Sequence, residues 1–283
     1  MERMEFDLKE MHKVQLNLFK RFQAVCREHG LTYFLGFGTL IGAVREHGIL
    51  DWDDSIDIVM PYRDFDKLLK LPQAVWGSDF FLQTYDSDPA YKKYYAKLRD
   101  SATTLILAED IDLDMNHGIP INIFPVIHLA DSVSERQSQI RNARLYKAIT
   151  EGKASDLDDS LLSTFVNMFL EISSVQQKIK IREHFKNETL KFEDEKTNCC
   201  FVLAEKKSLN LVLFKSWFDS AVIWEFEGMQ VNIPAGWREW LKLRYGDYMR
   251  LPISELQGSK ISDFVTLNPY KAYTYYKGKT YCV

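Results

Sequence analysis

The chain has 283 residues, of which 36 are Lys or Arg and 40 are Asp or Glu, giving a formal net charge of −4. Hydrophobic residues make up 46% of it, the composition of an ordinary globular protein long enough for one large domain or two small ones. A mildly acidic chain without a cluster of Lys and Arg argues against a nucleic-acid backbone as the main partner, although a nucleotide needs only a few local cations.

The sequence carries no pattern typical of export or of a membrane anchor. No apolar run approaches the roughly 18–20 residues that span a bilayer, and the first residues lack the apolar core of a signal peptide. The four cysteines form neither a disulfide framework nor a zinc-binding spacing. We therefore expect no transmembrane segment and a cytoplasmic protein.

The first predicted element is an amphipathic helix between residues 7 and 30. Asp7 and Glu10 have the spacing of a capping box, and Gly30 ends the pattern. Between them, apolar residues recur at steps of three and four, which places them on one buried stripe: Met11, Val14, Leu18, Phe22 and Val25.

Further strands and helices are expected along the chain. Strands are predicted at 31–37, 55–60, 80–85, 103–108, 119–124, 222–226 and 229–233. Helices are predicted at 62–71, after Pro61, over much of 132–191 with an acidic break at 155–160, and at 237–244.

This order predicts an α/β (α+β) fold in which a mixed sheet is flanked by helices. The expected division is a core at 1–130, a helical region at 131–195 and a C-terminal α/β region at 196–283 packed on the core. We expect the three parts to form one integrated domain.

The most informative stretch is FGTLIGAVREHGILDWDDSIDIVMP, at residues 37–61. A Gly38–Thr39 turn opens a short helical pattern, and an acidic loop then leads into the strand at 55–60. Backbone amides that seat a phosphate, with carboxylates nearby to hold a divalent cation, are what phosphoryl and nucleotidyl transfer require. The alternative is that these aspartates form a solvated turn or cap neighbouring amides.

The acidic positions of this stretch alternate in a way that suits a metal. In an extended chain Asp53, Ser55 and Asp57 share one face. Two carboxylates two residues apart on a strand can hold one Mg²⁺, which prefers oxygen ligands. Here that pair is Ser55 and Asp57, and serine is a poor substitute, so Asp53 is the expected additional ligand.

The same stretch closely resembles the signature of the LicD family, which comprises phosphocholine and related phosphotransferases of nucleotidyltransferase-type fold, with fukutin as a distant member. Three further blocks resemble the family's motifs and follow in its order. They are KLR at 97–99 with Thr103, GIPINIFP at 118–125, and IP at 233–234 followed by YGDYMRLP at 245–252. We interpret 245–249 as a structural closure of the domain.

The resemblance implies a reaction. A CDP-activated alcohol such as CDP-choline would transfer its phospho-alcohol to a hydroxyl of a glycan or teichoic-acid precursor, and CMP would leave. Gly38 and Thr39 would hold phosphate oxygens through backbone amides and the Thr39 hydroxyl. Asp57 and Asp53 would bind Mg²⁺ or Mn²⁺, which neutralises charge on the diphosphate.

Other residues become substrate-binding candidates on the same ground. Lys97 and Arg99 would offset phosphate charge, and Arg45 and Trp52 belong to the signature segment. Aromatic residues that could surround a quaternary ammonium group include Trp52, Tyr85, Tyr94, Tyr95 and Trp237.

Two positions depart from the family pattern. Ser55 and Asn122 stand where the resemblance implies carboxylates, and an amide cannot act as a base near neutral pH. One hypothesis is a phosphotransferase whose chemistry is rebuilt around Asp53, Asp54 and Asp57. Another is a protein that binds nucleotide or a partner without turnover. A third is a transferase for a different CDP-linked polyol phosphate.

Overall fold

The computed structural model describes residues 8–154, 157, 159–250 and 263–283. Three predictions therefore fall wholly or partly outside the described residues. They are the capping residue Asp7, most of the acidic break before residue 160, and the last two residues of the motif at 245–252.

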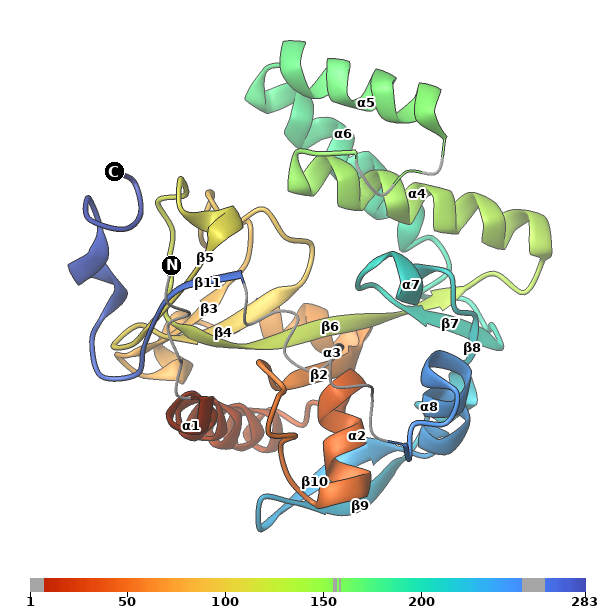
Figure 1. Ribbon diagram of the computed structural model, residues 1–283. Coiled ribbons are helices and arrows are strands. Elements are labelled where there is room, and N and C mark those ends of the chain that lie inside the picture. Colours follow the sequence, from red (N-terminus) through yellow and green to blue (C-terminus); the bar gives the residue numbers. More distant parts are fainter. Residues whose placement is uncertain (1–7, 155–156, 158, 251–262) are drawn as a thin grey trace.

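A curled mixed sheet forms the centre of the molecule (Figure 1). Its main path runs in the order β1 (Phe34–Leu35), β2 (Asp57–Pro61), β6 (Ile119–Leu129), β4 (Ala96–Asp100) and β3 (Phe80–Gln83). Strands β2 and β6 are parallel, and the other neighbours on this path are antiparallel. The predicted mixed sheet flanked by helices is confirmed.

Strand β6 is longer than predicted because its two halves have different partners. The first half lies between β2 and β4, and the second half pairs with β7 (Cys199–Val202), which in turn pairs with β8 (Leu213–Phe214). Most of its residues are apolar and buried, as expected for a central strand covered on both faces.

Helices cover the sheet where the sequence predicts them. α1 (Leu8–Glu28) buries Met11, Leu18, Phe22 and Val25 in the core, so the predicted stripe is confirmed. α3 (Tyr62–Leu69) follows directly after β2.

Three helices from the middle of the chain pack together on one side of the sheet, at the top of Figure 1. They are α4 (Val133–Glu151), α5 (Ser160–Ile172) and α6 (Val175–Thr189). Their shared core includes Ile149 from α4 and Val166 and Leu170 from α5. The expected helical region is confirmed, and among the described residues no helix is long and apolar enough to cross a membrane.

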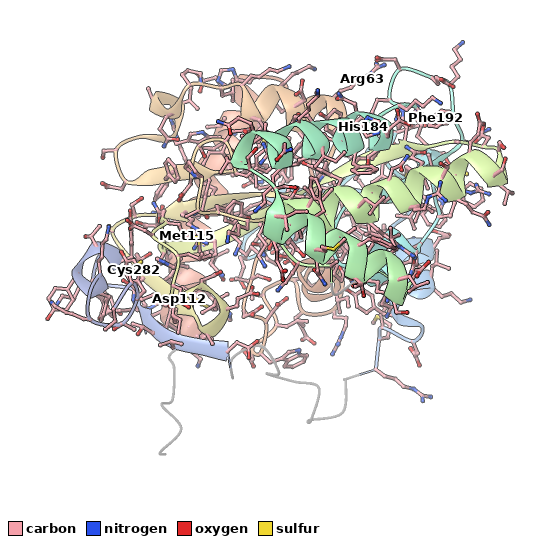
Figure 2. The ribbon with its side chains drawn as sticks, turned by 90° about the horizontal axis from the view of Figure 1, so that it is seen from above. Arg63, Asp112, Met115, His184, Phe192 and Cys282 are labelled. Carbon is pink, nitrogen blue, oxygen red and sulfur yellow. The ribbon has the colours of Figure 1, made fainter. Side chains whose placement is uncertain are left out.

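The C-terminal part contains further strands. β9 (Ala221–Phe226) and β10 (Met229–Pro234) form a hairpin, and α8 (Trp237–Tyr245) follows, all as predicted. The hairpin is a two-stranded sheet apart from the central one. Unpredicted elements include β7, β8, α7 (Lys206–Leu209) and β11 (Phe264–Asn268), which pairs with β5 (Thr104–Leu107) in another two-stranded sheet. The end of the chain lies beside a central loop, where the Cys282 amide donates to Ile111, and Figure 2 shows Cys282 near Asp112 and Met115.

Within the described ranges, three short 3₁₀ helices lie between the longer elements, and a fourth lies near the C-terminus. They are η1 (Gln73–Trp76), η2 (Ala108–Asp110), η3 (Lys215–Trp217) and η6 (Tyr273–Tyr276).

The start of the signature segment differs from its prediction. The strand expected at 31–37 is only the two residues of β1, because Gly36 already caps α2 (Phe37–Glu46) and donates its amide to the Asp57 carbonyl. Gly38 and Thr39 thus lie in the first turn of a helix and not in a separate turn. The strand expected from residue 55 begins at Asp57, because the Ser55 carbonyl accepts a hydrogen bond from the Thr39 hydroxyl.

Candidate functional site

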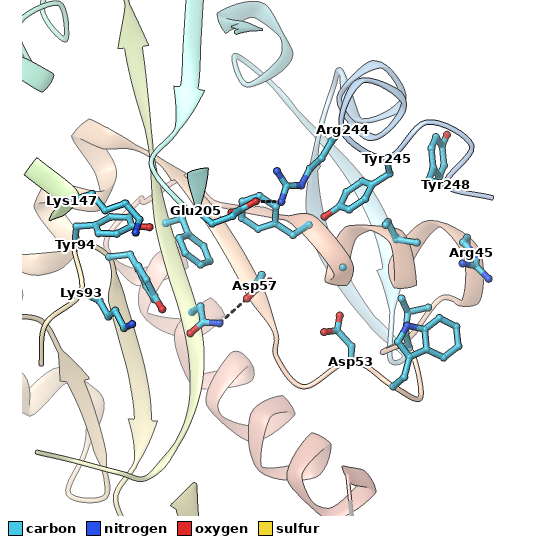
Figure 3. Close-up of a pocket in the computed structure, with 18 of the residues that line it drawn as sticks. Arg45, Asp53, Asp57, Lys93, Tyr94, Lys147, Glu205, Arg244, Tyr245 and Tyr248 are labelled. Atoms are coloured by element: carbon cyan, nitrogen blue, oxygen red, sulfur yellow. Dashed lines mark hydrogen bonds and ion pairs between the residues drawn. The ribbon is translucent and has the colours of Figure 1, made fainter. Parts of the chain in front are cut away.

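A cavity of about 890 Å³ lies where the signature segment meets α4, α8 and the central strands (Figure 3). Six of the residues predicted for the site line it: Gly38, Arg45, Trp52, Asp53, Asp57 and Asn122. The other four predicted residues, Thr39, Ser55, Lys97 and Arg99, are described by the structure and do not line it. The cavity therefore brings together predicted site residues that lie up to 84 positions apart in the sequence, from Gly38 to Asn122.

The first corner of the cavity brings Asp53 against the start of α2. A Cβ added to Gly38 would lie 2.4 Å from Oδ2 of Asp53, so the carboxylate rests directly on this glycine. The first amides of a helix have no partner within the helix and attract anions. A phosphate that approached these amides would meet the Asp53 carboxylate, and a cation between the two anions would remove their repulsion.

A row of side chains crosses three strands of the central sheet, and two of its members line the cavity. Asp57 on β2 lies opposite Asn122 on β6, and Asn122 lies opposite Lys97 on β4, so the three share one face of the sheet. Nδ2 of Asn122 donates a hydrogen bond of 2.8 Å to Oδ1 of Asp57, the dashed line at the centre of Figure 3. Oδ1 of Asn122 is buried and has no hydrogen-bond partner among the described residues.

Asn122 thus changes the electrostatics of the position. A carboxylate at 122 would face Asp57 with a like charge, whereas the amide adds no charge and donates a hydrogen bond to the Asp57 carboxylate. The amide oxygen of Asn122 cannot take a proton from an attacking hydroxyl. The sequence already shows that position 122 lacks the carboxylate that the family resemblance implies. Asp57 and Asp53 are therefore the carboxylates that the signature segment contributes to the cavity.

The Thr39 hydroxyl, predicted to bind a phosphate oxygen, forms hydrogen bonds within the protein instead. That hydroxyl accepts a 2.8 Å hydrogen bond from the Asp57 amide and donates one of 3.3 Å to the Ser55 carbonyl, and the residue is buried. Thr39 thereby joins α2 to the start of β2. Ser55 is also buried, with an Oγ that lacks a hydrogen-bond partner among the described residues, and neither side chain reaches the cavity.

Arg99 is an interior residue. It is 2% exposed, and its guanidinium donates to the side chain of Gln83 and to the Gly118 carbonyl. These bonds connect β4 with β3 and with the residue before β6. In this placement the guanidinium supports the sheet, and the predicted contact with phosphate finds no support.

Lys97 lines a second, smaller cavity of about 190 Å³ together with Glu109 and Asp110. Lys93 and Glu151 line both cavities, so the two adjoin. Burial, with a further contribution from the nearby Arg99 guanidinium, lowers the pKa of Lys97 to about 7. A lysine in this state carries only part of a positive charge at neutral pH, which weakens its predicted role as a phosphate counter-charge.

Four basic side chains of the large cavity, Lys93, Lys147, Arg244 and Arg250, escaped the sequence reasoning, and two of them lie on helices. Arg244 of α8 lies over the Phe37 ring at 4.6 Å, donates to Ser208 and forms an ion pair with Glu205. Lys147 of α4 forms a 2.6 Å ion pair with Glu151.

The two differ in whether the sequence could have revealed them. Arg244 directly precedes the motif at 245–252, which was a usable signal. Nothing in the sequence distinguished Lys147 from other cations of a helical region.

Aromatic side chains line much of the cavity. Of the five named from the sequence, Trp52, Tyr94 and Tyr95 line it, and Tyr85 and Trp237 do not. Tyr245 and Tyr248 also line it (Figure 3), although the motif that contains them was interpreted as structural. Aromatic faces attract cations, and Lys147 already lies 5.3 Å from the centre of the Tyr94 ring.

The residues present fit one kind of metal binding. Among the residues that the structure describes, no group of three or more His, Cys, Asp or Glu side chains could hold a metal ion by itself. Mg²⁺, however, commonly uses one or two carboxylates and completes its shell with substrate phosphates and water. Asp53 and Asp57 meet that lesser requirement, because both face the same cavity.

Comparison with known proteins agrees with this arrangement. Residues 30–111 match the family profile described as LicD/FKTN/FKRP, nucleotidyltransferase domain. The chain is also similar to the lipopolysaccharide cholinephosphotransferase LicD of Haemophilus influenzae, with 26% identity over 265 residues that cover 88% of this chain and 94% of that protein. The resemblance to the LicD family is confirmed. The matched range of the LicD profile holds Asp53 and Asp57, whereas Asn122, Lys147 and Arg244 lie beyond it.

Proposed function

We propose that this protein is a LicD-type phosphotransferase that moves phosphocholine, or a similar phospho-alcohol, from a CDP-activated donor to a glycan or teichoic-acid-type acceptor. The observation that carries the proposal is the convergence of Gly38, Asp53 and Asp57 from the LicD signature on one cavity of about 890 Å³. The similarity to a cholinephosphotransferase over most of both chains supports the same chemistry.

The transfer requires groups in the cavity that offset the negative charge of the diphosphate while one bond to phosphorus forms and another breaks. The acceptor hydroxyl loses its proton to the solvent, and its oxygen forms a bond to the phosphorus that bears the alcohol. The bond from that phosphorus to the bridging oxygen breaks, and CMP leaves with the electron pair. Mg²⁺ or Mn²⁺, when bound, would neutralise charge on the diphosphate, and Asp53 and Asp57 are the residues that would hold it. Arg244 adds a cation at the α8 side of the cavity.

The aromatic lining suits a quaternary ammonium group on the donor. Such a cation cannot donate hydrogen bonds and is recognised by ring faces. Tyr245 and Tyr248 lie on one side of Asp57 in Figure 3, and Tyr94 lies on the other. Trp52 lines the same cavity. We therefore favour choline over an uncharged polyol as the transferred alcohol.

The test is release of CMP from CDP-choline by the purified chain, with Mg²⁺, with Mn²⁺ and with a chelator. We expect release that requires the metal and that falls about 100-fold or more in Asp57→Asn, since the lost charge acts on the diphosphate. Asp54→Asn is the matched control, because Asp54 belongs to the same loop and does not line the cavity. Equal release by the Asp57 variant and the unaltered chain would contradict the proposal.

A second candidate is a LicD-type protein that binds the nucleotide without turnover. The hydrogen bond from Asn122 to Asp57 favours it, because it occupies one oxygen of the central carboxylate and replaces the expected acid with a neutral amide. Calorimetry would then show CDP-choline binding, with no CMP released. Asn122→Asp would raise Mg²⁺ affinity, because position 122 lines the cavity, and any cleavage gained would identify the lost carboxylate as the cause.

A further inference from the structure

Helix α5 carries apolar side chains on both of its faces. On the inner face, Val166 and Leu170 are buried against the neighbouring helices. On the outer face, four large apolar residues at steps of four, three and four form a stripe: Leu161 is 71% exposed, Phe165 62%, Met168 49% and Ile172 78%. A helix that is apolar all round needs a second apolar environment in addition to the core that it already covers.

Two more exposed apolar residues follow the break at Ser173 and Ser174. Val175 and Ile179, on the first turns of α6, are 68% and 45% exposed. We call these six residues the outer stripe. Figure 1 shows α5 on the outer side of the three-helix group, away from the central sheet.

The positive charges of α6, beside one end of the outer stripe, favour contact with an anionic surface. Residues 175–191 contain five Lys or Arg and two Glu, in a chain whose net charge is −4. Lys178 and Lys180 directly flank Ile179, which places the positive charge at the α6 end of the stripe. The charged neighbours at the α5 end are acidic: Glu171 and the capping Asp159. Leu and Phe on an exposed helix face with lysines along its edge are typical of helices that lie in the interface of an anionic membrane.

A second copy of the chain fits this surface less well. Association through the same face would bring the lysine-rich edges of both copies together, and like charges across an interface disfavour it.

We propose that the outer stripe of α5 and α6 holds this protein on an anionic membrane surface. The proposal rests on the proposed function in one respect: a glycan acceptor that carries a lipid would itself lie at a membrane. The similar Haemophilus protein is named for lipopolysaccharide, a glycan that carries its own lipid. Helix α4 connects the two sites, since its Lys147 and Glu151 line the cavity and its Ile149 packs with α5.

The experiment is cosedimentation with vesicles of phosphatidylcholine alone and of phosphatidylcholine mixed with phosphatidylglycerol. We expect binding to the anionic vesicles that weakens as salt is raised. Phe165→Gln combined with Ile172→Gln should reduce the partition coefficient at least 10-fold, because two large apolar groups are lost from the interface. Ile223→Gln is the matched control, since Ile223 is equally exposed, at 59%, on β9.

A charge variant tests the other half of the proposal. Lys178→Glu with Lys180→Glu should abolish the preference for anionic vesicles while leaving the apolar stripe intact. Failure of the unaltered chain to bind anionic vesicles, or equal binding by the Phe165 and Ile172 variant, would overturn the proposal. A dimer in light scattering that this variant dissociates would overturn it in favour of a second copy.

Vesicle binding and CMP release are separate measurements. A chain that binds vesicles but releases no CMP contradicts the proposed function alone. A chain that releases CMP from dissolved donor but ignores vesicles contradicts only the membrane proposal.

Discussion

Single side chains at the corner between α2 and β2 determine the shape of the cavity. Thr39 holds the backbone before and at Asp57, and Gly38 leaves space for the Asp53 carboxylate. The sequence predicted that both residues serve a phosphate. For Gly38 this stays a prediction, because it lines the cavity, whereas the Thr39 hydroxyl is already engaged within the protein.

The structural role of Thr39 can be measured. Thr39→Val leaves the buried Asp57 amide without its acceptor, which should lower the free energy of unfolding by about 1–3 kcal/mol. Thr39→Ser retains the hydroxyl and should lose less than half as much. Urea denaturation of the two variants and the unaltered chain compares these values, and equal losses would show that the methyl group matters more than the hydrogen bonds.

Lys97 gives the sheet an unusual pH dependence. Its pKa is about 7 in the folded chain and about 10.4 when unfolded, so between these values the unfolded state binds a proton that the folded state lacks. The contribution of Lys97 therefore destabilises the fold most below pH 7 and is relieved as the pH rises toward 10.

Lys97→Met should remove this dependence. We expect the variant to be more stable than the unaltered chain at pH 6.5, by on the order of a few kcal/mol, and the difference to shrink by pH 9.5. Lys92→Met, at an exposed neighbouring position, should change little at either pH. Urea denaturation across this range is the measurement, and a difference that does not vary with pH would refute the assigned cause.

At the scale of elements, the predictions succeeded where the pattern is local. The stripe of α1, the Pro61 start of α3 and the β9–β10 hairpin can each be recognised within about twenty residues of sequence. The pairing of β11 with β5 could not, because the strands are some 160 residues apart. The same holds for the second half of β6, whose strand conformation depends on β7.

The buried side chain of Glu193, in the segment after α6, forms a hydrogen bond with the backbone of β6. Glu193 accepts a 2.6 Å hydrogen bond from the His128 amide, and burial raises the pKa of Glu193 to about 7. Between about pH 4.5 and 7 the folded state keeps a proton that the unfolded state has lost. Stability from this group is thus present at acidic pH and is lost as the pH rises through 7.

Glu193→Gln should therefore stabilise the chain selectively. The amide retains an acceptor oxygen for His128 and never carries a charge, so we expect a gain on the order of 2–3 kcal/mol at pH 8 and almost none at pH 4.5. Glu195→Gln, on an exposed neighbour, serves as the control. Thermal or urea unfolding at the two pH values decides, and an equal gain at both would exclude ionisation as its origin.

At the scale of the whole molecule, the sequence located the site but not its full composition. Asp53, Asp57 and Gly38 could be named because they share one contiguous segment with known chemistry. Lys147 reaches the cavity only because the fold brings α4 to it, and such convergence leaves no local trace in a sequence. Arg244 of α8 could have been found from the motif at 245–252, which it directly precedes. Arg99 shares a strand face with Lys97, but Gln83 and the Gly118 carbonyl engage its guanidinium, and a strand pattern does not reveal such partners.

The length of β6 makes the molecule difficult to divide. Its eleven residues provide ladder partners for β2, β4 and β7, so the signature segment and the C-terminal region share one strand. A fragment ending at residue 130 would leave the far half of β6 with an open edge, a surface prone to aggregation. Truncation at that point should yield insoluble protein, whereas any damage to β6 in the intact chain would be transmitted to both regions together.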